Sequence, residues 1–116
     1  MWFIIESTND RFYPDTILAS TAFHYSNNPY QTIENLVNLK PNKILVNRTL
    51  ISKKERILIQ RDPGYSNNSA VVTFIQEDKF LDLFKEYNCI YSHDQGHRDG
   101  NLFGDYKHMS YVFVKK

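Results

Sequence analysis

The chain has 116 residues, of which 41% are hydrophobic, 15% aromatic and 23% charged, and its 14 basic and 13 acidic side chains leave a net charge of +1. This apolar content is too high for an intrinsically disordered chain, and no stretch reaches the ~18 apolar residues that a membrane-spanning helix needs. The length suits one globular domain, so residues 1–116 are expected to fold as a single domain with no membrane partner.

Two features of the sequence indicate a cytoplasmic protein. The first apolar run, residues 2–5, is short and meets Glu6, so it lacks the basic flank and the long apolar core of a secretory signal. The single cysteine, Cys89, cannot form an internal disulfide, which agrees with a reducing compartment. Packing is the expected role of Cys89, and no cysteine-based metal site is expected.

The N-terminal third is predicted to hold one strand and two helices. Residues 2–6 form a dense apolar run followed by turn-forming residues, which indicates a strand buried on both faces inside a sheet. Residues 15–24 fit a short helix capped by an aspartate, although their Thr and Ser content leaves a strand possible. A second helix is predicted over 29–39, because Asn28 can cap it, a proline suits its first position and Gln31 can complete a capping box.

The middle of the chain is predicted to form a basic β-hairpin. Residues 43–51 and 56–61 both contain β-branched runs, and residues 52–55 form the turn between them. The same four turn residues match a capping-box pattern that would start a helix at Lys53, an alternative that the β-branched runs disfavour. A further strand is predicted over 70–76.

The C-terminal part is predicted to form one helix and two strands. Residues 77–87 place four large apolar side chains on one helix face, and Asn88 can take the left-handed conformation that ends a helix. A short strand over 90–92 and a longer one over 107–115 follow. Because residues 111–114 are all apolar or aromatic, the last strand is also expected near the centre of a sheet.

These elements predict an α+β fold: a mostly antiparallel sheet of five to six strands with two to three helices. If the helices cover only one face of the sheet, the two terminal strands leave apolar side chains on the other face without a partner. A homodimer is one way to cover them.

The densest polar cluster is the predicted loop of residues 93–105. Connections of this length without secondary structure are usually functional or disordered. His93, His97 and Asp99 are the candidates for metal binding or acid–base catalysis, and His108 could join them from the next strand. However, the four-residue histidine spacing aligns two ligands only on a helix, and a glycine between them argues against one. A loop with surface or partner-contacting histidines is therefore favoured, and no metal or cofactor is expected.

The tetrapeptide Tyr-Ser-Asn-Asn occurs at residues 25–28 and again at residues 65–68. Both copies fall in predicted loops. Antibody-like binding loops have a similar composition, because tyrosine supplies rigid contact area while Ser and Asn supply adaptable hydrogen bonds. Ordinary turn chemistry in an Asn-rich chain is the simpler alternative. On the first interpretation, Tyr25, Tyr65 and Asn67 contact a partner.

The net charge conceals an uneven distribution. Residues 40–61 contain seven bases and one acid, a sum of +6, whereas residues 1–39 sum to −3 and residues 62–116 to −2. A basic ribbon of this kind can steer the protein toward nucleic acid or an acidic protein surface. Alternatively, its cations are solvated turn residues that protect an edge strand from aggregation. The near-neutral total argues against a general nucleic-acid binder.

The function favoured by these features is non-catalytic binding of another protein. The candidate contacts are Arg48, Lys53, Lys54, Arg56, Tyr25, Tyr65, Asn67, His97 and Arg98. The composition is rich in residues with AT-rich codons, which is typical of low-GC bacteria and their phages, so a phage or mobile-element inhibitor or modulator of a host or defence factor is the specific form of the hypothesis. The alternatives are a small metal- or histidine-dependent nuclease or phosphodiesterase, and a nucleic-acid-binding protein that uses residues 40–61.

Overall fold

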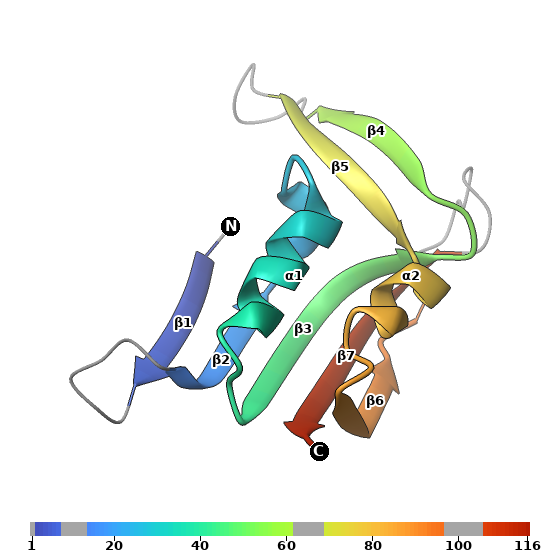
Figure 1. The fold of residues 1–116 in the computed structure, drawn as a ribbon. Coiled ribbons are helices and arrows are strands. Elements are labelled where there is room, and N and C mark those ends of the chain that lie inside the picture. The colour runs from blue at the N-terminus through green and yellow to red at the C-terminus, as the bar shows by residue number, and fades with distance from the viewer. Residues whose placement is uncertain (1, 8–13, 62–68, 97–105) are drawn as a thin grey trace.

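The computed structural model describes residues 2–7, 14–61, 69–96 and 106–116 (Figure 1). Its elements are β1 (Trp2–Ser7), β2 (Pro14–Ser20), the 3-10 turn η1 (Phe23–Tyr25), α1 (Pro29–Asn38), β3 (Lys43–Ser52), β4 (Arg56–Arg61), β5 (Ser69–Gln76), α2 (Glu77–Asp82), β6 (Tyr87–Asp94) and β7 (Tyr106–Lys115). Among these described residues, four of the six strand pairings are antiparallel. The predicted α+β class with a mostly antiparallel sheet is therefore confirmed.

Strand β3 is the centre of the sheet. Along its N-terminal half it lies between β2, which is parallel to it, and β7, which is antiparallel, with β1 beyond β2 and β6 beyond β7. At Ile51 and Ser52, its last residues, β3 pairs in parallel with β5, and β5 in turn pairs with β4. Strands β4 and β5 thus form a two-stranded ribbon, the β4–β5 ribbon, that projects from the main sheet (Figure 1).

The predicted basic hairpin is wrong in its pairing. Both strands exist close to the predicted bounds, but β5 lies between β3 and β4. The physical reason is the pattern of burial: four consecutive residues of β5, from Val72 to Ile75, are buried, whereas Ile57 and Ile59 of β4 are exposed. A strand with apolar groups on both faces gains more from an inner position than a strand with one apolar face.

Two predictions for the N-terminal region are also wrong. Residues 15–24 form β2 and η1 rather than a helix, because Ile17 and Ala19 alternate toward the core and Ile17 is the register partner of Ile44 on β3. Asp15 does not cap a helix; its backbone carbonyl accepts a hydrogen bond from the Asn42 N–H at 2.8 Å. Strand β1 exists as predicted but lies at the edge of the described sheet, not inside it.

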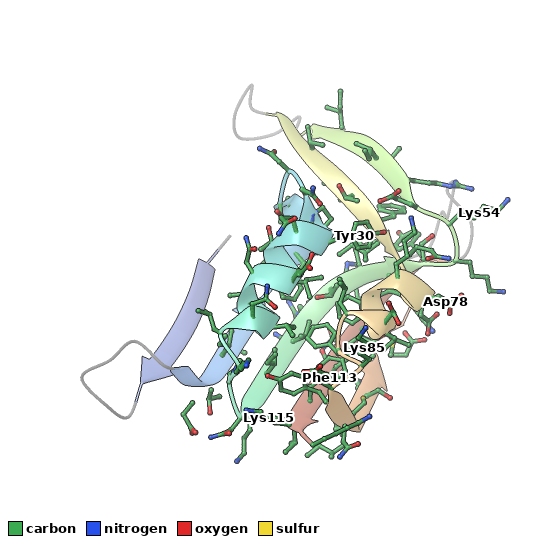
Figure 2. The ribbon with its side chains drawn as sticks, in the orientation of Figure 1. Tyr30, Lys54, Asp78, Lys85, Phe113 and Lys115 are labelled. Carbon is green, nitrogen blue, oxygen red and sulfur yellow. The ribbon has the colours of Figure 1, made fainter. Side chains whose placement is uncertain are left out.

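Helix α1 confirms the predicted start. The Asn28 side chain accepts a hydrogen bond from the Gln31 N–H at 3.2 Å, and Pro29 is the first helical residue. The capping box is only half formed, since the Gln31 side chain donates to Asn35 instead of reaching back to the cap. The hydroxyl of Tyr30, labelled in Figure 2, accepts the Gln76 N–H at 3.0 Å and so ties α1 to the junction of β5 and α2.

Helix α2 is shorter than predicted. It ends at Asp82, and the chain turns through 83–86 into β6, so Tyr87 and Asn88 are strand residues and Asn88 is not a cap. The Tyr87 hydroxyl donates to the Pro41 carbonyl at 2.6 Å, which holds the start of β6 against the link between α1 and β3. This distant contact lies outside the local pattern that predicted a continuous helix.

Both helices pack on one face of the sheet, and the main core lies between them and it (Figures 1 and 2). Its buried members are Ala19, Ala22, Phe23, Ile33, Ile44, Val46, Ile51, Ile75, Phe80, Phe84, Tyr87, Met109, Tyr111 and Phe113. A smaller cluster contains buried Leu50, Val72 and Phe74. Because Leu50 precedes the core residue Ile51 on β3, the smaller cluster faces away from the helices.

Candidate functional site

A cleft of about 730 Å³ lies beneath the β4–β5 ribbon, over the smaller cluster. Its apolar lining comes from three strands: Leu50 on β3, Leu58 and Ile59 on β4, and Val72 and Phe74 on β5. Two tyrosines that pack against this cluster, Tyr25 from η1 and Tyr106 from β7, line the cleft as well. Segments that are far apart in the sequence therefore meet at this cleft.

Two histidines also line the cleft. His24, in η1, is only 2% exposed, and its Nδ1 has no hydrogen-bond partner within the described ranges. Burial lowers the pKa of His24 to about 4, and the charge of the nearby His108 on β7 adds to the effect. His24 is therefore neutral at pH 7, and the cleft contains a buried imidazole with an unsatisfied nitrogen.

The backbone at the rim of the cleft is in an unusual conformation. Thr21 and Arg48 both have left-handed φ angles, of 51° and 55°. Asn47 and Arg48 lie opposite Ser110 alone, which makes a bulge in β3, and the Arg48 N–H donates to the Ser110 hydroxyl at 3.3 Å. Left-handed backbone at residues other than glycine costs on the order of 1 kcal/mol or more and is frequent at functional sites.

Aromatic rings form two groups around the cleft. The Tyr25 ring lies 4.4 Å from that of His24, between centroids. Across the cleft lining, the Tyr106 ring lies 5.1 Å from Phe74 and packs edge-on against His108 at 6.2 Å. These contacts fix the planes of the half-buried tyrosine rings.

The other face of the β4–β5 ribbon carries an aliphatic patch, formed by Ile57, Ile59 and Val71. These side chains are 68%, 69% and 50% exposed. Ile57 pairs with Thr73 and Ile59 with Val71, so the three share one face of the ribbon with the core residue Ile75. The ribbon extends beyond the helices that cover Ile75, and this leaves the patch in contact with solvent (Figure 1).

A basic turn, formed by Lys53, Lys54 and Arg56, connects β3 to the ribbon (Figure 2). All three side chains are exposed, and Glu55 is the one acid among them. Ser52 shapes the turn, because its hydroxyl accepts the Lys54 N–H at 3.1 Å and donates to the Lys54 carbonyl. The turn therefore presents its cations next to the first residues of β4.

The structure brings some of the predicted site residues together. Arg48 and Tyr25 line the same cleft, and the three cations of the basic turn lie at the start of the ribbon. His93 lies on β6, exposed, with its ring 6.4 Å from Tyr91, and it is not part of the cleft lining. The remaining candidates, Tyr65, Asn67, His97, Arg98 and Asp99, lie outside the described residues.

Sequence reasoning missed His24 and assigned His108 to another cluster. His24 is the last residue of the segment 15–24, which was expected to be helical, so its burial carried no sign of a cleft. Each of these two histidines has a tyrosine close to it in the sequence, and this is the signal that could have found them. Tyr25 follows His24 directly, and Tyr106 lies two positions before His108, on the same face of the strand.

Within the parts of the chain that the structure describes, no group of three or more His, Cys, Asp or Glu side chains is arranged to hold a metal ion. Among the described helices, none has the length and apolarity to cross a membrane. No protein-family model and no curated protein sequence matches the chain.

Proposed function

We propose that the protein is a non-catalytic binding protein that engages another protein through the β4–β5 ribbon. The observation that carries this proposal is the aliphatic patch, whose three side chains lie together on one face and are each at least half exposed. Single exposed apolar residues are ordinary on a protein surface, whereas contiguous apolar groups indicate an interaction site. A two-stranded ribbon is also weakly stable alone and gains from being covered.

The basic turn supports a partner with an acidic surface. Three cations and one acid stand at the end of the ribbon, and all are exposed. Exposed charges of this kind contribute mainly to the rate of association and to the choice of partner, while buried apolar area supplies most of the affinity. The partner in this proposal therefore has an apolar patch bordered by Asp and Glu.

Strand β4 offers a further means of protein contact. It pairs with β5 on one side, and no strand within the described ranges pairs with its other side. The backbone N–H and C=O groups of such an edge can pair with an extended segment of a partner, with apolar pockets supplying specificity. Nucleic acid has no comparable use for this edge, which favours a protein partner.

The chain's composition supports a narrower form of the proposal, in which the protein comes from a phage or mobile element and inhibits or modulates a host or defence factor. A cytoplasmic location agrees with the single cysteine. A second copy of this chain is the competing occupant of the patch, and the experiments below separate a homodimer from a complex with another protein.

The double substitution Ile57→Asp and Ile59→Asp is expected to weaken the complex by about 100-fold or more, because two aliphatic side chains lose their burial and two charges face the partner. The partner is first identified by tagged capture from host lysate, and affinity is then measured by calorimetry. Ile90→Asp is the matched control, because Ile90 is 65% exposed on β6, away from the ribbon.

The Ile90→Asp control should bind within about threefold of the unmodified protein, and circular dichroism should show that both variants are folded. Unchanged affinity in the double variant would exclude the aliphatic patch as the contact. Self-association of the purified protein that the double variant abolishes would assign the patch to a homodimer. Capture of bulk nucleic acid without a protein would also overturn the proposal.

Charge reversal of the basic turn, Lys53→Glu with Lys54→Glu, is expected to slow association with the partner by about tenfold at low salt. Dissociation should change much less, because these side chains are exposed at the rim of the proposed contact. Surface plasmon resonance at two ionic strengths measures both rates, and the difference between variants should shrink at high salt. Equal association rates at low salt would remove the basic turn from the contact.

A further inference from the structure

The cleft beneath the ribbon has the size and lining of a small-molecule site. Its volume of about 730 Å³ lies within the ~300–1,000 Å³ range of ligand clefts. Leu50, Leu58, Val72 and Phe74 give it an apolar wall, and polar side chains, among them Thr21, His24, Arg48, Gln95 and His108, supply much of the rest of the lining. Side chains alternate between the two faces of a strand, so Leu58 and Val72 lie on the face of the ribbon opposite the aliphatic patch. The cleft therefore lies on that opposite face. Of the three patch residues, Ile59 also borders the cleft.

The rings at the cleft suit a planar group. Tyr25 and Tyr106 are half-buried, so part of each ring remains open while neighbouring rings fix its plane. A ligand ring can stack on such a preformed aromatic surface without first ordering it. Aliphatic ligands would gain burial here but would not use the ring planes.

The charges at the cleft suit an anion. Arg48 is exposed at the rim, and among the described lining residues there is no Asp or Glu. The left-handed bulge and the hydrogen bond to Ser110 hold the Arg48 backbone in place. A guanidinium binds phosphate and carboxylate groups through two parallel hydrogen bonds, so its placement here favours a ligand with one of these groups.

His24 adds an unsatisfied hydrogen-bonding group. Its Nδ1 is buried without a partner within the described ranges, and an unpaired buried polar atom in a native structure calls for a bound group or water. His24 borders the cleft, but its Nδ1 is closed to solvent, so a ligand seated there can supply that partner only if the cleft lining shifts. Within the described residues, the free cleft thus offers a ligand an apolar wall, two tyrosine rings and the Arg48 cation.

We propose that this cleft binds a planar aromatic anion, that is, a ring bearing a phosphate or carboxylate group, as in a mononucleotide. The ring stacks against Tyr106 or Tyr25, and the anionic group meets Arg48 at the rim. This ligand is independent of the protein partner proposed for the aliphatic patch. The same chemistry is offered by a free mononucleotide and by the terminal nucleotide of a single strand, and the test separates the two.

Titration with adenosine 5′-monophosphate, followed by calorimetry and by amide chemical shifts, tests the proposal. Adenosine, which lacks the anion, and inorganic phosphate, which lacks the ring, are each expected to bind at least about tenfold more weakly. Arg48→Gln should weaken the monophosphate about tenfold and leave adenosine unchanged, whereas Tyr106→Leu should weaken both. Lys115→Gln removes an exposed cation at the far end of β7 and should change neither affinity.

A short oligodeoxyadenylate that binds much more tightly than the monophosphate would identify a strand end as the source of the ligand. Absence of shifts at Leu50, Phe74 and Tyr106 with the monophosphate, with benzoate and with the oligonucleotide would overturn the proposal. So would equal loss of binding in Arg48→Gln and Lys115→Gln, because the interaction would then be general attraction to a cation. Melting temperatures within about 3 °C of the unmodified protein show that each variant is folded.

Discussion

The substitution Phe80→Ala is expected to lower the free energy of unfolding by about 4 kcal/mol, since truncation of a buried phenylalanine removes transfer free energy and leaves a cavity. Phe80 of α2 is fully buried, and its ring lies 5.1 Å from Phe84 and 5.2 Å from Tyr111, with Phe23 and Phe113 slightly further away. This one ring joins both the helix and β7 to the core. A chain of this length has a total stability of ~5–15 kcal/mol, so the loss is a large part of it.

Urea denaturation followed by tryptophan fluorescence or circular dichroism measures this loss, and the melting temperature should fall by on the order of 15 °C. Leu81→Ala is the matched control, because Leu81 is the next residue of the same helix and is exposed. It should cost less than about 1 kcal/mol. Similar losses for the two variants would show that Phe80 is not the centre of the core.

Three of the strands and the first helix were predictable because their signals are local. Residues 43–51, 70–76 and 107–115 are apolar runs that correspond closely to β3, β5 and β7. The start of α1 follows from Asn28 and the proline after it, which act within one turn of the chain. Local propensity and the observed fold agree at these elements, so no distant information was needed.

Strand pairing was not predictable in the same way. Proximity along the chain favoured a hairpin of residues 43–51 and 56–61, yet β5 lies between them because it is buried on both faces. Strand β1 is a dense apolar run that nevertheless lies at the edge of the described sheet. In both cases the position of a strand in the sheet depends on how much apolar area the distant strands offer for pairing. The sequence of one strand alone does not contain this information.

The cleft was not predictable because no local motif marks it. Tyr25 was selected for a repeated tetrapeptide and Arg48 for its charge, and only the topology brings them to one site. His24 became important through its burial, which the predicted helix over 15–24 did not reveal. The topology thus brings Tyr25 and Arg48 together, whereas His93 is not part of the cleft lining and His97 lies outside the described residues.

The burial of His24 should make the protein sensitive to acid. The pKa of His24 is about 4 in the folded protein against 6.5 in the unfolded chain, because burial and then the charge of His108 oppose its protonation. As pH falls below 6.5, the unfolded chain binds this proton first, so acid favours unfolding. The stability that the buried, neutral His24 contributes is fully present above pH 6.5 and is lost as pH falls toward 4. It amounts to about 3 kcal/mol between those limits.

Urea denaturation of the unmodified protein, His24→Gln and His93→Gln at pH 7.0 and 4.5 isolates this effect, because carboxylates titrate alike in all three. His24→Gln should lose about 2 to 3 kcal/mol less than the unmodified protein on acidification, since its side chain binds no proton. His93→Gln, at an exposed position on β6, should keep the full pH dependence.

An NMR titration of the His24 ring provides the direct measurement, with a midpoint expected near pH 4. His108→Gln should raise that midpoint, because the second cause of the shift is then absent, but burial should still hold it below 6.5. Retention of the full pH dependence by His24→Gln would show that this histidine is not the acid-sensitive group. A midpoint near 6.5 would show that the imidazole is solvated, and the cleft lining at His24 would then be open to water.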